Sequence, residues 1–380
     1  MRIVVVDTYY PAFVDEHYRR HPELRQAGYE EQFASLMARC FGTSDAYSHH
    51  LSELGHTAAE VAVNCFELQS AWTREHGRRS LVRLAGSLPT PVGIAARRRF
   101  LHEVANAQIQ ELDPDVVYVQ DLWFFRRAEL DAFRARGRLV VGQIASSPPR
   151  VELLRGFDLI TTSFPHFVQR FRAAGIDSEY FKIGFYERVL DRLRASGIDP
   201  SPRAERPHQV SFIGGLNPRV HAGGTALLER LAPRVPLSIW GYGIDGLAAE
   251  SPVRARYQGE AWGLDMYAVL SRSRVSLNRH IDVAEGYANN MRLFETTGVG
   301  ALLLTEAAPN LDDLFAPGRE VVTYESENDL VDKIDHYLRH EDDRVEIAAA
   351  GQRRTLSEHS YRRRMSELAA ILRQRLDGVR

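Results

Sequence analysis

Four polar side chains stand close together in the second half of the sequence, directly before an apolar run. They are Asn289, Asn290, Arg292 and Glu295, and the run is ALLL at residues 301–304. An Asn that caps a helix leaves the first backbone amides at its positive dipole end for an anion, and Arg292 and Glu295 then share one helix face. We expect Arg292 to neutralise a diphosphate and Glu295 to accept hydrogen bonds from ribose hydroxyls. The alternative is an intrahelical ion pair worth roughly a few tenths of a kcal/mol.

A second polar stretch follows the strand pattern of residues 209–213. Its double glycine, Gly214-Gly215, lets a ligand approach the backbone closely because glycine has no Cβ. Three polar side chains that suit a phosphate or a sugar come next: Asn217, Arg219 and His221. A structural turn explains the two glycines equally well. The stretch is neither a GxGxxG fingerprint nor a GK[ST] loop, which disfavours a nicotinamide cofactor or a P-loop NTPase.

Two further strand ends carry candidate donor-binding residues. The first strand end comprises Trp240, Gly241 and Tyr242, two aromatic residues with a small residue between them. Such a pair suits a base or a sugar, although core packing of Trp240 is at least as plausible. The second is a loop dense in charge, and a solvated surface loop has the same composition. Its donor-binding candidates are Arg279, His280, Tyr287 and Ala288, and Glu285 in the same loop is a candidate catalytic residue.

The elements that must position these residues form two βα series. In the first, strands are expected at residues 3–6, 57–64, 116–119, 139–144, 159–162 and 180–183, with helices at 45–54, 92–112 and 164–174. In the second, strands are expected at 209–213, 237–240, 275–278, 301–304 and 321–324, with helices at 224–231 and 266–271. Alternating short β-branched runs and amphipathic segments indicate parallel α/β sheets. Residues 196–207 contain three prolines and read as a linker.

The predicted fold is therefore α/β with two Rossmann-like domains and a ligand cleft at the carboxyl ends of both sheets. The domain boundaries are 1–200 for an acceptor-binding domain, 208–360 for a nucleotide-sugar domain, and 361–380 for a C-terminal helix that packs back on the first domain. For this basic amphipathic helix, membrane association is the less favoured alternative.

The first domain contains a Tyr- and His-rich insertion, Thr8 to Thr43, where βα loops usually take roughly 2 to 6 residues. It either shapes a substrate pocket or is a helical cover for the sheet. Acceptor contacts are expected from Tyr9, Tyr10, Tyr47 and Ser48. By position alone, the candidates for a catalytic base are Asp121, Asp45 and His49.

Composition excludes several other classes of protein. The 380 residues carry a net charge of −2, which favours neither nucleic acid nor an anionic membrane. Two cysteines, Cys40 and Cys65, indicate buried thiols of a cytoplasmic protein. No stretch suggests a signal peptide or a membrane span. Zinc and hydrolase motifs are absent, and Asp113-Pro114-Asp115 precedes a strand, so we expect a turn there and no metal site.

The second half resembles the nucleotide-sugar domain of GT-B glycosyltransferases, in particular the bacterial CgeB-like (spore maturation protein) branch of the group-1 families. Three stretches carry the resemblance, and a fourth, FGTSDAYSHHLSELGH, supports it in the first half. The three are SLNRHIDVAEGYANNMRLFE, TGVGALLLTEAAPNLDDLFAPGREVVTYES and DLVDKIDHYLRHEDDRVEIAAAGQRRTLSEHSYRRRM. The group-1 pattern has two glutamates eight residues apart. Glu295 matches the second, but Tyr287 occupies the first position and Glu285 lies two residues earlier.

The resemblance implies a hexosyltransferase-type enzyme (EC 2.4) that moves a sugar from a nucleoside-diphosphate sugar, with UDP or GDP, to an acceptor glycan, protein or small molecule. No cofactor and no metal are expected, so cations and helix amides would stabilise the leaving diphosphate. Retention of configuration is slightly preferred over inversion. The alternatives are a nucleotide-sugar epimerase of the same fold and a non-catalytic nucleotide-sugar-binding protein.

Overall fold

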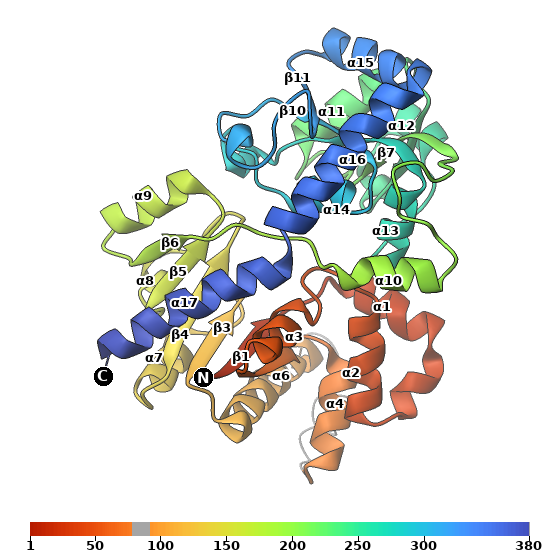
Figure 1. The fold of residues 1–380 in the computed structure, drawn as a ribbon. Helices are drawn as coiled ribbons and strands as arrows, with labels where there is room; N and C mark the ends of the chain where they lie inside the picture. The colour runs from red at the N-terminus through yellow and green to blue at the C-terminus, as the bar shows by residue number, and fades with distance from the viewer. Residues whose placement is uncertain (78–91, 380) are drawn as a thin grey trace. The chain divides into compact units, whose positions relative to one another are not determined.

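A computed structural model describes residues 1–77 and 92–379 of the chain (Figure 1). The described residues form two compact units. Unit 1 comprises Met1–Lys182 together with Met365–Arg380, and unit 2 comprises Ile183–Arg364. Each unit has its own parallel sheet, and we describe each by itself.

Unit 1 is built on a six-stranded parallel sheet with the strand order β2-β1-β3-β4-β5-β6. The four residues of β3 and of β5 are buried throughout, as expected for strands covered on both faces. The strands are β1 (Arg2–Asp7), β2 (Thr57–Ala62), β3 (Val116–Val119), β4 (Leu139–Ile144), β5 (Leu159–Thr162) and β6 (Ser178–Tyr180).

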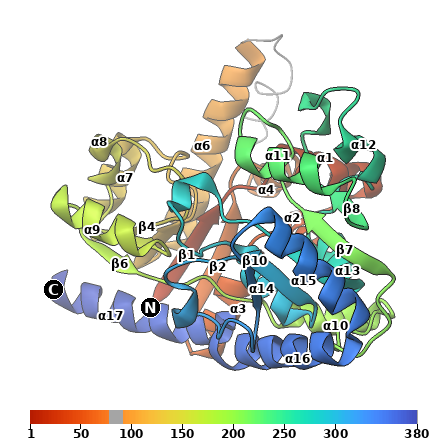
Figure 2. The same ribbon diagram turned by 90° about the horizontal axis from the view of Figure 1, so that it is seen from above.

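Helices cover both faces of this sheet. Figures 1 and 2 show α3 and α17 on one face and α6, α7 and α9 on the other. The helices are α1 (Pro11–Arg20), η1 (Pro22–Gln26), α2 (Tyr29–Ala38), α3 (Ala46–Glu53), α4 (Phe66–Glu75), α6 (Val92–Leu112), α7 (Arg127–Arg134), α8 (Val151–Leu154), α9 (Pro165–Ala173) and the Met365–Val379 part of α17 (Tyr361–Val379).

The C-terminal helix belongs to unit 1 through most of its length. Met365, Leu368 and Leu372 of α17 are fully buried, and Arg375 forms an ion pair of 2.8 Å with Glu179 of β6. The predicted return of the last helix to the first domain is therefore confirmed. Among the described residues, no helix combines the length and the apolar character needed to cross a membrane.

The insertion after β1 is a helical layer made of α1, η1 and α2. Tyr9 and Tyr18 are buried, and the Tyr18 hydroxyl donates a hydrogen bond of 2.7 Å to Gln32. Tyr10 is half exposed, with 51% of its surface accessible. Most of the aromatic rings of the insertion therefore serve to pack this layer, as the alternative of a helical cover predicts.

Unit 2 is built on a five-stranded parallel sheet with the order β11-β10-β9-β7-β8. Helices α13, α14 and α16 pack together, and α11 packs with α12 and α15. The strands are β7 (His208–Ile213), β8 (Leu237–Trp240), β9 (Ser273–Asn278), β10 (Leu302–Glu306) and β11 (Val322–Tyr324). The helices are α10 (Arg188–Ala195), α11 (Ala222–Leu231), α12 (Pro252–Arg256), α13 (Leu264–Ser271), α14 (Met291–Gly298), α15 (Glu327–Arg339) and α16 (Glu341–Glu358).

The proline-rich segment 196–207 is attached to unit 2 and does not run free between the domains. Arg206 is buried and donates hydrogen bonds to backbone carbonyls of Ser271, Ser273 and Gly300, at 2.7, 3.2 and 2.7 Å. Gly300 adopts φ +70°, and a Cβ there would lie 2.7 Å from the carbonyl oxygen of Pro200. Charged hydrogen bonds to several carbonyls thus hold this segment on the base of the sheet.

The structure places two segments differently from the sequence analysis. Residues 183–200, expected in the first domain, lie in unit 2, because α10 packs on α13 through an apolar face that includes Val189 and Leu193. The strand expected at residues 180–183 ends at Tyr180 and begins at Ser178. The other strands and the helix Val92–Leu112 lie where the sequence predicts them, within about two residues at each end.

Two smaller expectations are confirmed. Asp113-Pro114-Asp115 forms the turn between α6 and β3, where Asp115 accepts a hydrogen bond of 2.7 Å from the backbone amide of Arg2. Asp113 pairs with Arg2 at 3.0 Å, and this cation holds the pKa of Asp113 below its ordinary value. Cys40 and Cys65 are both buried thiols.

Candidate functional site in unit 2

Helix α14 begins at the carboxyl edge of the unit 2 sheet, next to the ends of β7 and β9. Asn290 occupies its N-cap position, but the Asn290 side chain makes no capping hydrogen bond. Instead its amide donates to Asn278 Oδ1 at 2.8 Å and to the backbone carbonyl of Arg279 at 3.0 Å. Asn290 thus takes the predicted cap position without the side-chain capping bond, because its side chain fastens the loop before α14 to the end of β9.

Arg292 and Glu295 form an ion pair of 2.8 Å on one face of α14, as their spacing predicts. The pair is largely enclosed, with 16% of the Arg292 side chain and 7% of the Glu295 side chain accessible. Burial raises the pKa of Glu295, while Arg292 and the Tyr267 hydroxyl act in the opposite direction. The intrahelical ion pair that the simpler alternative expects is therefore present, and its enclosure sets it apart from an ordinary surface salt bridge.

Arg292 also joins α14 to the double-glycine turn. Its Nη2 donates a hydrogen bond of 3.3 Å to the carbonyl of Ile213, the last residue of β7, directly before Gly214. Tyr267 of α13 donates from its hydroxyl to Glu295 Oε1 at 3.5 Å. The two polar stretches found in the sequence therefore meet at one place in the unit.

The turn after β7 leaves no room for side chains at its glycines. A Cβ on Gly215 would lie 2.2 Å from Nε2 of His221, and one on Gly241, which has φ +153°, would lie 1.8 Å from the carbonyl of Gly214. The Tyr242 ring stacks on Trp262 with centroids 5.5 Å apart and meets His221 edge-on at 6.3 Å. Glycine is thus required at Gly241, where a Cβ would meet backbone, whereas at Gly215 the contact is with the end of the His221 side chain.

The loop after β9 is held by a carboxylate that sequence reasoning did not single out. Glu306, at the end of β10, pairs with Arg279 at 3.3 Å and accepts a hydrogen bond of 2.8 Å from the backbone amide of His280. Arg279 also pairs with Asp282 at 3.0 Å. Burial raises the pKa of Glu306, and burial lowers the pKa of both His280 and His221.

An asparagine clamp fixes the same loop further along. The backbone amide of Ala288 donates to Asn310 Oδ1 at 2.7 Å, and the Asn310 side-chain amide donates back to the Ala288 carbonyl at 3.0 Å. Three side-chain atoms nearby in the sequence are buried without a hydrogen-bond partner among the described residues: His280 Nδ1, Asn289 Nδ2 and Asn290 Oδ1. Buried polar atoms are usually satisfied, so such a group is expected where a ligand supplies partners.

Four further predicted residues differ in their exposure. Trp240 is buried with its ring 4.9 Å from that of His208, as its core-packing alternative predicts. Arg219 is exposed, and only its backbone amide contacts Asn217 Oδ1, at 3.0 Å. Glu285 is exposed in the left-handed region with φ 51°, and Tyr287 is partly buried in the same loop.

The carboxyl edge of unit 1 gathers four carboxyl groups: Asp7, Asp45, Glu60 and Asp121. Asp121 accepts hydrogen bonds of 2.9 Å from the Thr8 hydroxyl and from the backbone amide of Trp123. Burial, with a smaller contribution from Asp121, raises the pKa of Asp7 to about 7. Burial also raises the pKa of Glu60, which accepts a hydrogen bond of 2.9 Å from the Ser48 backbone amide.

The predicted acceptor residues surround this group in different ways. Tyr9 is buried, and Asn64 clamps its backbone with hydrogen bonds of 2.8 and 2.7 Å. Tyr47 is buried and its hydroxyl donates to Gln143 at 2.8 Å. Tyr10 remains open to solvent, and Ser48 contributes its backbone amide to Glu60.

His49 belongs to a small group on α3 with His50 and Glu53. The ligand-type atoms of the three residues lie within 4.8 Å of one another, which is close enough for a metal ion. However, His50 Nδ1 already forms a hydrogen bond of 2.8 Å with Glu53, and His49 faces the same carboxylate at 3.7 Å. Ion pairing along one helix accounts for this group.

The sequence offered a usable signal for some of the residues that were missed. Asp7 and Glu306 are the last residues of β1 and β10 and follow the predicted strands 3–6 and 301–304 closely, and strand ends in open α/β sheets are where ligands bind. Tyr267, Asn310 and Glu60 carried no such signal, because their roles arise from contacts across elements distant in sequence.

Comparison with known proteins adds to this geometry. The glycosyl transferase-like family model matches residues 223–370, which cover most of unit 2 from the start of α11 onward. The comparison with curated proteins found no match.

Three solved structures illustrate the fold. Anabaena HepE in complex with UDP-glucose has a TM-score of 0.56 at 13% identity, covering 98% of this chain and 99% of that one. AviGT4, a glycosyltransferase involved in avilamycin A biosynthesis, has a TM-score of 0.53 at 15% identity, covering 88% of each chain. The UDP-GlcNAc 2-epimerase of Neisseria meningitidis bound to UDP-GlcNAc has a TM-score of 0.54 at 10% identity, covering 98% of this chain and 100% of that one.

These comparisons define the class of fold. The fold is the GT-B type, with two Rossmann-like α/β units and a C-terminal helix that returns to the first, as the sequence predicts. The segment 223–370 resembles a glycosyl transferase domain.

Proposed function

We propose that the protein is a glycosyltransferase of the hexosyltransferase type (EC 2.4) that uses a nucleoside-diphosphate sugar held by unit 2. The observation that carries this proposal is the enclosed Arg292–Glu295 pair, which lies on α14 and reaches the end of β7 beside the double glycine. The match of the glycosyl transferase-like family model over residues 223–370 supports it. The structures of HepE with UDP and UDP-glucose favour UDP as the nucleotide.

In this proposal each side chain has a distinct task. Glu295 accepts hydrogen bonds from the ribose, and Arg292 turns from Glu295 toward the diphosphate as its charge develops. Glycines 214 and 215 allow the backbone to approach the ligand, while His221 and Arg279 add donors. Because these groups supply positive charge, the proposed reaction needs no metal ion.

The acceptor is proposed to bind unit 1. Asp121 and Asp45 belong to the set of four carboxyl side chains at the edge of the unit 1 sheet. In an inverting reaction, a carboxylate there could take the proton from an acceptor hydroxyl. A retaining reaction, which we slightly prefer, does not require this base. The CgeB-like branch and a bacterial, cytoplasmic setting remain predictions from the sequence.

A second candidate function is nucleotide-sugar epimerisation. The Neisseria UDP-GlcNAc 2-epimerase has the same fold over nearly the whole chain, which favours this alternative. An epimerase acts on one substrate, so it has no need of an acceptor site. A non-catalytic nucleotide-sugar-binding protein is the third possibility, and it would need only the contacts of unit 2.

One experiment separates these functions. The protein is incubated with a panel of UDP-, GDP- and dTDP-sugars, and the products are resolved by chromatography and mass spectrometry. A transferase releases the nucleoside diphosphate slowly by hydrolysis, whereas an epimerase changes the sugar without releasing UDP. Absence of both binding and hydrolysis across the panel would overturn the proposed function.

A further inference from the structure

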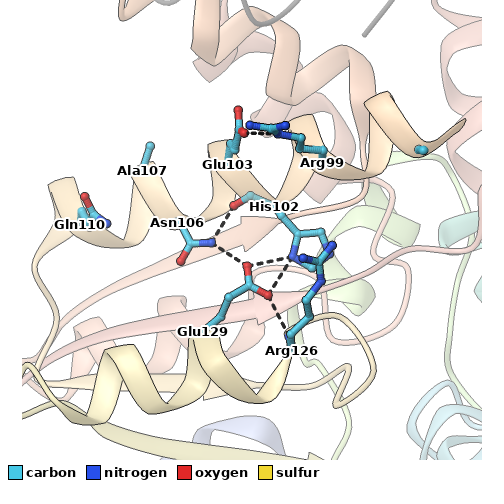
Figure 3. Close-up of a pocket in the computed structure, with 9 residues that line it drawn as sticks. Arg99, His102, Glu103, Asn106, Ala107, Gln110, Arg126 and Glu129 are labelled. Atoms are coloured by element: carbon cyan, nitrogen blue, oxygen red, sulfur yellow. Dashed lines mark hydrogen bonds and ion pairs between the residues drawn. The ribbon is translucent and has the colours of Figure 1, made fainter. Parts of the chain in front are cut away.

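Unit 1 contains a cavity of about 770 Å³ that the sequence analysis did not predict. It lies between α6 and the segment that joins β3 to α7, and Figure 3 shows the polar side chains that line it. Those that carry the argument are Arg99, His102, Glu103, Asn106, Arg126 and Glu129. The segment from β3 to α7 also contains Asp121, so the cavity adjoins the loop that carries a predicted base.

The acidic groups of the cavity are already engaged. Glu103 pairs with Arg99 at 2.7 Å. Glu129 accepts hydrogen bonds from His102 Nδ1 at 3.0 Å, from the Asn106 amide at 2.9 Å and from the backbone amide of Arg126 at 2.8 Å. Burial opposes ionisation of Glu129, yet these hydrogen bonds hold its pKa below the ordinary value. Glu129 is therefore charged and has little capacity left to bind a ligand.

The position of His102 is fixed by its neighbours. Its ring stacks on Phe124 with centroids 4.5 Å apart and an interplanar angle of 9°, and Phe125 packs edge-on at 6.4 Å. Because Nδ1 faces the Glu129 carboxylate, it is Nε2 that is left for another partner. A ring held by a carboxylate and an aromatic stack is preorganised for binding.

Two polar groups in the cavity have no hydrogen-bond partner in the described part of the chain. They are Nε2 of His102 and the guanidinium of Arg126, whose side chain is exposed and is drawn with His102 among the lining residues in Figure 3. A guanidinium presents a planar fork of N–H donors that binds carboxylates and phosphates. Because the carboxylates of the cavity are already engaged, Arg126 is the group that can hold an acidic ligand.

We propose that this cavity binds the acceptor through an acidic group, a carboxylate or a phosphate monoester, held by Arg126. The assignment of this ligand as the acceptor rests on the proposed function. Asp121 and Arg126 lie on the same loop, five residues apart, so their Cα atoms are separated by at most about 18 Å. One small molecule can span that distance, with its acidic group on Arg126 and a hydroxyl toward Asp121.

The test is calorimetry of the full chain with three probes: glucuronate, glucose 6-phosphate and, as the neutral reference, glucose. We expect at least one acidic probe to bind about tenfold more tightly than glucose, and Arg126→Gln to remove about tenfold of that affinity. Whichever acid binds more tightly identifies carboxylate or phosphate as the recognised group. Arg98→Gln, an exposed arginine of α6 outside the cavity lining, is the control and should leave binding unchanged.

The outcomes distinguish this proposal from the proposed function. Equal affinity for glucose and both acids, or an Arg126→Gln variant that binds as tightly as the wild type, would overturn the acidic-group site. UDP binding is measured on the same samples. If UDP binds and neither acid does, the site in unit 1 is wrong; if an acid binds through Arg126 and no nucleotide does, the acidic-group site stands and its acceptor role falls.

Discussion

Both units place polar side chains at the carboxyl edge of a parallel sheet, but they differ in how their acidic groups are partnered. Unit 2 pairs its acids with cations, as in Arg279–Glu306 and Arg292–Glu295. In the described part of the chain, neither Asp7 nor Glu60 of unit 1 forms an ion pair, and burial raises the pKa of both carboxyl groups. The cations of unit 2 can exchange a carboxylate partner for a diphosphate, whereas the carboxyl groups of unit 1 can form hydrogen bonds with the hydroxyls of an acceptor.

The units are also alike in one detail. An asparagine holds the backbone of a loop residue with two reciprocal hydrogen bonds in each: Asn64 clamps Tyr9 in unit 1, and Asn310 clamps Ala288 in unit 2. The two units therefore hold their loops in the same way but differ in the charged groups at the sheet edge. We infer that the sheets fix the loops and that the side chains at the edge select the ligand. The predictions below test that division.

The largest effect is expected from Arg206→Met, which should destabilise unit 2 by about 3 to 5 kcal/mol. The substitution leaves several buried carbonyls, including those of Ser271 and Gly300, without their charged donor. Urea unfolding followed by a probe in each unit measures the change. Arg203→Met is the control, because Arg203 is exposed and pairs only with exposed Asp342. Similar losses in both variants would show that segment 196–207 is not held by Arg206.

Arg292→Ala should lower turnover of the proposed donor by about a hundredfold, or roughly 2.7 kcal/mol. Its cost to the free energy of unfolding should be smaller, since Glu295 already has a raised pKa and can take up a proton when its partner is removed. Steady-state kinetics and chemical denaturation on one preparation give both values. A loss of stability without loss of turnover would assign Arg292 to folding alone.

Asp7→Asn should remove a pH dependence of stability from unit 1. The pKa of Asp7 is about 7 in the folded state against an ordinary value of 3.8, so the folded state binds an extra proton between these values. The free energy of unfolding therefore falls as pH rises from about 4 to about 7, by about 2 kcal/mol after allowance for partial solvent contact. Melting curves across this range check it, with exposed Asp15→Asn as the control. An unchanged slope in Asp7→Asn would contradict the burial of this carboxyl group.

Asn310→Ala and Asn64→Ala should each cost about 1 to 2 kcal/mol of stability, because each removes a pair of hydrogen bonds to a loop backbone. Only Asn310→Ala should also weaken UDP binding, by about threefold to tenfold. Thermal denaturation and calorimetry compare the two variants directly. Equal effects on UDP binding would mean that the units do not divide their ligands as proposed.

Much of the fold follows from local patterns in the sequence. Strands such as Val116–Val119 and Leu237–Trp240 are short, buried and bounded by turn residues, so their limits can be predicted. The attachment of residues 183–200 could not be predicted, because it depends on packing of α10 against α13, more than sixty residues later in the chain.

Part of the candidate site could likewise be predicted from the sequence, and part could not. The pairing of Arg292 with Glu295 follows from helical spacing and was predictable. Asn289 or Asn290 was expected to cap α14; Asn290 occupies the cap position, but contacts of its side chain with Asn278 and Arg279 replace the local capping bond. The hydrogen bonds of Glu306 and the cavity beside His102 join distant segments, which local patterns do not reveal.

The central claim is that unit 2 binds a nucleoside diphosphate through the start of α14. Calorimetry with UDP on the wild type and Glu295→Ala tests it most directly, with exposed Glu250→Ala as the matched control. We predict that Glu295→Ala weakens UDP binding by about 1 to 3 kcal/mol, through loss of charged hydrogen bonds to the ribose, while Glu250→Ala binds as the wild type does. Unchanged affinity in Glu295→Ala would contradict the account.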